Sequence, residues 1–165
     1  MKAASLNEIK SEMKTLTAAE LLDLCLHLAK FKKENKELLS YLLFEAADEL
    51  SYIQNVKDLI TEQFEGINQS NLYFAKKSIR KILRTTSKHI KYSGSKQTEV
   101  ELLLFFCKKL KLTGIPIESS TALSNLYLRQ LQKIEKALAT MHEDLQYDFR
   151  EELKLLPDYS FLRNY

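Results

Sequence analysis

The chain has 165 residues, of which 45% are apolar and 28% charged, and it contains only three glycines and two prolines. Sheet proteins need many tight turns built from Gly, Pro and Asn, so this composition argues against all-β and α/β folds. The ordinary apolar fraction argues against disorder. We therefore expect an all-α protein, residues 1–165 forming a single domain of about six to eight helices, either an antiparallel bundle or a short α-α superhelix.

The net charge of +3 conceals an uneven distribution. Residues 34–65 sum to −6, whereas residues 66–98 carry eight Lys or Arg and no acid. An acidic segment is therefore followed by a strongly basic one, and the basic segment is the candidate contact for an oppositely charged partner.

Two further features bear on the compartment. Cys25 and Cys107 stand apart in apolar stretches, which predicts two buried thiols in a reducing environment rather than a disulfide. The N-terminal residues lack the apolar region of a secretory signal, and no apolar run is long enough to span a bilayer. We expect a cytoplasmic protein without a membrane span.

Capping signals and apolar periodicity predict three helices before residue 51. Ser5-x-x-Glu8 and Thr17-x-x-Glu20 match the capping box, in which a hydroxyl and a carboxylate satisfy each other's backbone N–H groups. The third helix is apolar on most sides, so we expect it to lie centrally. The predicted ranges are 6–14, 18–32 and 36–50.

Three more helices are predicted in the middle of the chain. Ser51-x-x-Gln54 and Thr98-x-x-Glu101 are further capping boxes, and Asn71 is an expected N-cap. Only the Ser51 cap separates the third helix from the fourth, so these two could also form one long helix. The sixth helix is apolar nearly all round and should be the most buried element. The predicted ranges are 52–66, 72–92 and 99–112.

A long C-terminal helix, 120–155, is predicted after Gly114–Pro116, where the breakers allow a subdivision of the domain. A break in this helix is expected near 142–148. It carries a heptad-like apolar seam, which can pair with a second copy or pack along the chain's own bundle. Both uses remain open. The seam consists of Tyr127, Leu131, Ile134, Leu138, Met141 and Leu145.

The search for catalytic chemistry is mostly negative. Three scattered glycines cannot form a phosphate-binding loop, and the three histidines match no metal-binding pattern. Glu45, Asp48 and Glu49 would share one face of the third helix, but no His or Cys joins them, so a solvated acidic face is the favoured interpretation. We predict no catalytic residue, metal or cofactor, and hence not an enzyme.

The feature that stands out is a basic stripe on helix 72–92. At about 100° per residue its cations fall on one side and its apolar residues on the other, with Tyr73 in the cationic sector and Tyr92 at the far end. Like charges at i,i+4 repel each other, so something must offset the crowding. The stripe consists of Lys76, Lys77, Arg80, Lys81, Arg84, Lys88 and Lys91.

Three sources of negative charge could neutralise the stripe. Asp58, Glu62 and Glu65 of the preceding helix could face it, an external polyanion could bind it, or it could lie on an anionic membrane. The leading hypothesis is a non-catalytic binding or adaptor protein that engages an acidic macromolecule, a protein or the phosphates of a nucleic acid. The alternative is a protein–protein scaffold or homodimer formed through the C-terminal seam, without a nucleic-acid role.

Overall fold

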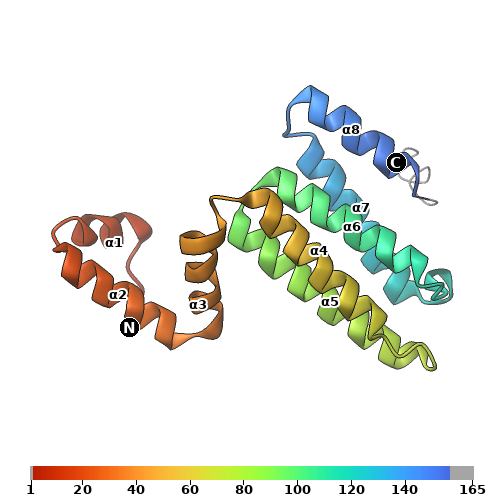
Figure 1. Ribbon diagram of the computed structural model, residues 1–165, viewed down its shortest axis with the longest axis horizontal. Coiled ribbons are helices and arrows are strands. Elements are labelled where there is room, and N and C mark those ends of the chain that lie inside the picture. The colour runs from red at the N-terminus through yellow and green to blue at the C-terminus, as the bar shows by residue number, and fades with distance from the viewer. Residues whose placement is uncertain (1, 157–165) are drawn as a thin grey trace. The chain divides into compact units, whose positions relative to one another are not determined.

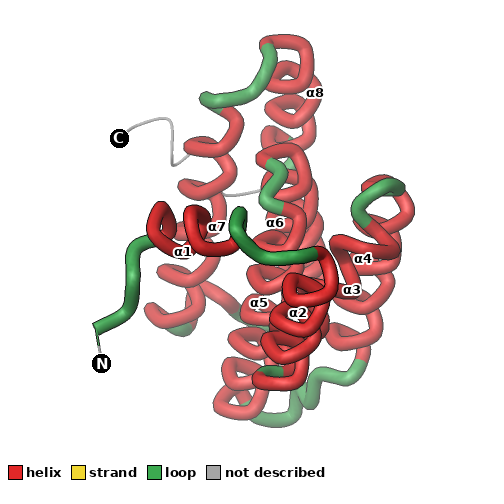
Figure 2. The backbone as a smooth tube through the Cα atoms, turned by 90° about the vertical axis from the view of Figure 1, so that its left-hand side faces the viewer, coloured by secondary structure: helices red, strands yellow, loops and turns green. Residues whose placement is uncertain are grey.

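The computed structural model describes residues 2–156, and every element in that range is helical (Figure 2). Eight α-helices, one π-helical turn and one 3-10 turn are joined by short connections, with no strand among the described residues. The all-α prediction is confirmed. The chain falls into two compact units that divide between Glu45 and Ala46.

The first unit begins with two short helices whose capping boxes are both present, as predicted. The backbone N–H of Ser5 donates to Glu8 Oε2 at 2.7 Å, and that of Thr17 donates to Glu20 Oε2 at 2.8 Å. These bonds satisfy N–H groups that a helix start leaves unpaired. The elements of this unit are α1 (Leu6–Met13), α2 (Ala18–Phe31), α3 (Lys33–Ser40) and the π-helical turn η1 (Tyr41–Glu45).

This first unit has almost no core. None of the residues of α1, α2 or α3 is buried, although α2 and α3 pack against each other. Eleven large apolar side chains are exposed there, whereas a helical globular domain normally buries most side chains of this kind. They are Leu6, Ile9, Met13, Leu22, Leu24, Leu26, Leu28, Phe31, Leu42, Leu43 and Phe44.

The predicted central helix over 36–50 is wrong. The α-helix ends at Ser40, the chain continues as the π-helical turn, and residues 46–48 are not helical. Asp48 then starts the next helix, so the third and fourth predicted helices do not fuse. Leu42, Leu43 and Leu50 are exposed rather than central. The apolar pattern indicated that these residues need burial but not what would bury them.

The second unit is an antiparallel helical bundle. Figure 1 shows α4, α5, α6 and α7 running alongside one another, with α8 packed against α6 and α7. Its elements are α4 (Glu49–Glu65), α5 (Leu72–Ser93), α6 (Lys96–Leu112), the 3-10 turn η2 (Ile117–Ser119), α7 (Thr121–Leu138) and α8 (Glu143–Lys154).

Helix α6 forms the centre of this bundle, as its all-round apolar pattern predicted. It contacts α4, α5, α7 and α8. Gly94 and Gly114 flank it with φ values of +67° and +70°, a left-handed conformation that glycine adopts at little steric cost. Its buried residues are Thr98, Val100, Leu102, Leu103, Leu104, Phe106, Cys107 and Leu110.

Two of the predicted capping boxes are displaced by three residues. Helix α4 is capped by Asp48, whose Oδ1 accepts from the backbone N–H of Ser51 at 3.1 Å. Helix α6 is capped by Ser95, whose Oγ accepts from the backbone N–H of Thr98 at 3.3 Å. Ser51 and Thr98 are therefore donors inside the first turn. Both helices begin three residues earlier because a better-placed acceptor precedes each predicted cap.

The predicted C-terminal helix over 120–155 is two helices, α7 and α8. The break lies at residues 139–142, slightly before the predicted position, and His142 is the N-cap of α8. Gly114–Pro116 lies inside the second unit and does not divide it. The aromatic tail that follows Leu156 lies outside the described residues.

The apolar seam packs mainly within the chain's own bundle. Its first four side chains, Tyr127, Leu131, Ile134 and Leu138, are buried in the second unit, where α7 packs on α6. Met141 and Leu145 are half-buried. Of the two uses left open by the sequence, packing within one chain is the one that the contacts display. Pairing through the seam stays a prediction without support.

Candidate anion-binding face

Helix α5 carries the basic stripe, and its sequence explains why it is long and fixed in orientation. Asn71 Oδ1 accepts from the backbone N–H of Tyr73 at 2.8 Å, which caps the helix as predicted. The helix then continues for 22 residues to Ser93. Its buried residues, Ala75, Ile79, Ile82 and Thr86, recur at three- and four-residue spacing and lie on the side that packs against α4 and α6.

The cations of the basic stripe lie away from that buried side. Five of them are exposed, and Lys76 and Lys88 are half-buried. At about 1.5 Å per residue, the 15-residue interval from Lys76 to Lys91 spans roughly 22 Å. Seven cations make six intervals over that length, which gives a mean spacing of about 3.7 Å along the axis, close to the ~3.4 Å between charges along one DNA strand.

Most of the stripe has no counterion within the described part of the chain. No ion pair within 4.0 Å joins an acid to Arg80, Arg84 or four of the lysines: Lys76, Lys77, Lys81 and Lys91.

The acids expected on α4 do not supply one. Among residues 2–156, neither Asp58 nor Glu62 nor Glu65 forms an ion pair, and the Asp58 carboxylate instead accepts from Gln54 Nε2 at 2.8 Å. These three acids therefore do not relieve the repulsion between cations of the stripe by direct pairing.

Lysines elsewhere in the second unit behave differently. Two of them bridge helices: Lys57 pairs with Glu101 at 2.5 Å, and Lys108 pairs with Glu152 at 2.5 Å. Two more, Lys96 and Lys111, also have a glutamate partner. Ion pairs therefore form at several lysines of the described bundle, whereas six of the seven cations of the basic stripe have none.

Exposed aromatic side chains lie at the N-terminal end of the stripe. Tyr73 is 66% exposed and Phe74 51% exposed, and their rings meet edge-on with centroids 5.5 Å apart. Phe74 was missed at the sequence level, although the same angular rule places it at about 160°, next to Lys81. Tyr92, at the other end, is half-buried and packs edge-on against His89.

The acidic trio considered for catalysis does not share a helix face. Glu45 ends η1, Asp48 caps α4, and the Glu49 carboxylate accepts from the hydroxyls of Ser93 and Thr98. That prediction of a common face is wrong because the helix is interrupted between Glu45 and Glu49. Within the described range, no group of three or more His, Cys, Asp or Glu side chains could hold a metal ion.

The two cysteines differ in burial. Cys107 is buried in α6, and burial raises the pKa of its thiol. Cys25 is exposed on α2, so the prediction of two buried thiols is wrong for this residue. The residues next to Cys25 in the sequence are apolar, but the first unit does not provide the packed side chains that would bury it.

Compared with models of protein families, with curated proteins and with solved structures, this chain gives no match in any of the three. As far as the structure describes the chain, none of its helices has both the length and the apolar character that a membrane crossing requires. The functional argument therefore rests on the geometry and charge of the surface.

Proposed function

We propose that this protein is a non-catalytic binding protein that engages the phosphate backbone of nucleic acid through the basic stripe of α5. The observation that carries the proposal is that six cations of the stripe have no acidic partner among the described residues. An external polyanion would relieve their mutual repulsion and release its own counterions, which favours association.

The exposed aromatic pair favours nucleic acid over an acidic protein as the partner. Tyr73 and Phe74 lie beside the first cations of the stripe, and unstacked bases bind to such rings with little sequence preference. The combination of a cationic track with adjacent aromatic faces is typical of single-strand binding. We therefore expect single-stranded nucleic acid to bind more tightly than duplex.

The first test measures binding of a fluorescent single-stranded oligonucleotide by anisotropy at low salt. The wild type should bind, and its affinity should fall roughly 300-fold between about 50 and 200 mM salt if roughly six phosphates of the single strand are neutralised. Absent or salt-independent binding would remove the proposal.

The decisive variant reverses two adjacent charges of the stripe, Arg80→Glu with Arg84→Glu. It should lose detectable binding at low salt and keep its helical circular dichroism, because both side chains are exposed. The matched control is Arg129→Glu with Lys133→Glu on α7, two exposed cations at the same i,i+4 spacing. The control makes the same change in net charge and should still bind. Equal losses of binding affinity in both variants would show that net charge alone, and not the stripe, causes the binding.

Replacing Tyr73 and Phe74 with alanine tests the stacking part of the proposal. Each base–aromatic contact is worth about 1–3 kcal/mol, so the double variant should bind the single strand roughly tenfold or more weakly. Its salt dependence should stay that of the wild type because no phosphate contact is removed. An unchanged affinity would leave the phosphate contacts but exclude stacking, and with it the preference for single strands.

A further inference from the structure

Helix α2 has far more apolar surface than its own unit covers. At about 100° per residue its apolar side chains occupy roughly 240° of the circumference. A helix of this kind is normally buried, yet no residue of α2 is. Its four polar side chains, which share the remaining sector, are Glu20, Asp23, His27 and Lys30.

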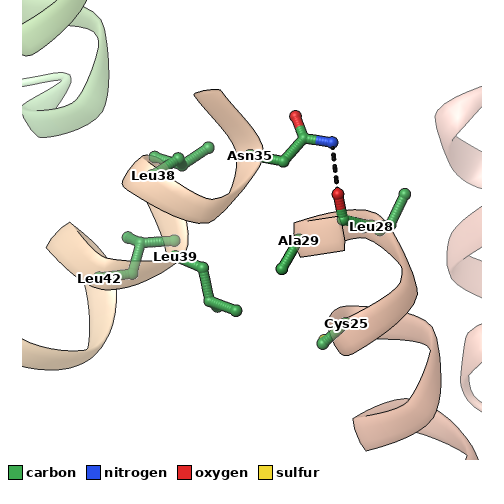
Figure 3. A pocket seen from close by; sticks show the side chains of 7 residues that line it. All are labelled: Cys25, Leu28, Ala29, Asn35, Leu38, Leu39 and Leu42. Atoms are coloured by element: carbon green, nitrogen blue, oxygen red, sulfur yellow. Dashed lines mark hydrogen bonds between the residues drawn. The ribbon is translucent and has the colours of Figure 1, made fainter. Parts of the chain in front are cut away.

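The contact with α3 uses only the middle of that apolar arc. Figure 3 shows Cys25 and Ala29 of α2 facing Leu39 across a groove. The groove has a volume of about 270 Å³. Asn35 Nδ2 donates to the backbone oxygen of Leu28 at 2.8 Å and ties the two helices together at one end. On one side of the groove α2 lines a second pocket together with α1, whereas the large apolar side chains on the other side are exposed.

One of these sides has a self-complementary order of charges. Leu22 and Leu26 form it, with exposed fractions of 59% and 44%, and we refer to them as the Leu22/Leu26 flank. The same angular rule places Asp23 near 160° and Lys30 near 140° when Cys25 is at zero, so both border the flank. Within the described chain, neither Asp23 nor Lys30 forms an ion pair.

We propose that the Leu22/Leu26 flank pairs with the same flank of a second copy of this chain, with the two α2 helices antiparallel. A twofold axis near Leu26 brings Asp23 of each copy opposite Lys30 of the other, so both ion pairs form at once. Antiparallel helix dipoles add a favourable term. An isologous contact of this kind closes as a dimer.

The order of charge along the flank is what selects a second copy as the occupant. Acid comes first and base seven residues later, about 10 Å along the helix. Reversing the direction of the helix exchanges the two, so the flank matches its own antiparallel image at both ends. A helix of another sequence would form both ion pairs only if it also carried an acid followed seven residues later by a base.

The test begins with the molecular mass of the full chain by sedimentation equilibrium at increasing concentration. The wild type should approach twice the chain mass. Leu26→Glu should weaken dimerisation by roughly 100-fold or more, because it places two carboxylates at an apolar contact. The control Leu112→Glu changes an exposed leucine of α6 and should still dimerise. A monomeric wild type, or a Leu26→Glu variant that still dimerises, would overturn the proposal.

A charge exchange gives the sharper result and does not disturb the apolar residues. Asp23→Lys and Lys30→Asp should each weaken the dimer by roughly tenfold, because each replaces two attractions with two repulsions. The double variant should restore the wild-type dissociation constant to within about threefold, since the pairs reform with the charges exchanged. Circular dichroism checks that each variant stays helical. Failure of the double variant to recover would show that Asp23 and Lys30 do not face each other.

Discussion

The two units of this protein are built from the same kinds of helix but differ in what their apolar residues do. In the second unit α6 is surrounded by four helices, and four of its five leucines and Phe106 are buried. In the first unit α2 is equally apolar, yet one packed neighbour leaves most of it exposed. The difference shows that apolar periodicity identifies the face of a helix that favours burial. The number of neighbouring helices determines whether that face is buried.

The largest expected difference between the units is in amide hydrogen exchange. At low protein concentration, amides of α2 should be protected at least about 100-fold less than those of α6, because short helices without a core open readily. Mass spectrometry of peptides from the two helices measures this.

Protein concentration sharpens that experiment. If the Leu22/Leu26 flank dimerises, protection in α2 should rise with concentration while protection in α6 stays constant. Equal protection of α2 and α6 in dilute solution would instead mean that the first unit is as stable as the second, against the contrast drawn from burial.

Two leucines of α6 test the core of the second unit directly. Leu103 is 2% exposed and Leu112 is 81% exposed. Leu103→Ala should lower the free energy of unfolding by about 2–5 kcal/mol, because it removes buried methyl groups and leaves a cavity. Leu112→Ala should change it by no more than about 0.5 kcal/mol. Urea denaturation followed by circular dichroism measures both, and similar losses would contradict the assigned burial.

Local signals in the sequence predicted the elements of both units well. Capping boxes at Ser5 and Thr17 located α1 and α2, and Asn71 located α5. Two other boxes misplaced helix starts because Asp48 and Ser95, three residues upstream, are also good N-caps. A capping motif depends on which of two nearby acceptors the chain uses, and that choice is set by packing beyond the local sequence.

Tertiary features were less predictable. The interruption between Glu45 and Glu49 has no Gly or Pro to signal it, so a continuous helix was the natural expectation. The basic stripe was visible from helical geometry alone, because the grouping of its cations on one side of the helix depends only on residue spacing. Whether Asp58 and Glu62 pair with it was not visible, because that depends on how far α4 is rotated about its own axis.

The smallest expected effect concerns the start of α2, where the charge of one carboxylate supports a helix that has little packing. The Glu20 carboxylate accepts hydrogen bonds from the backbone N–H and the hydroxyl of Thr17, and these lower the pKa of Glu20 below its ordinary value of 4.5. A pKa that is lower in the folded state gives a stabilisation that is complete above pH 4.5 and is lost as the pH falls through the folded value. Acidification through that range should therefore reduce the helical signal of α2.

Carboxyl-carbon NMR titration measures this directly, and the Glu20 midpoint should lie below 4.5 in the wild type. Thr17→Ala removes the hydroxyl but keeps the backbone donor, so the midpoint should move only part of the way back. Ser11→Ala, an exposed position in α1 away from this cap, should leave it unchanged. A wild-type midpoint at 4.5 or above would mean that the capping bonds do not persist in solution. The start of α2 would then be frayed. Fraying would shorten the helix and weaken the dipole interaction that favours antiparallel pairing of two α2 helices.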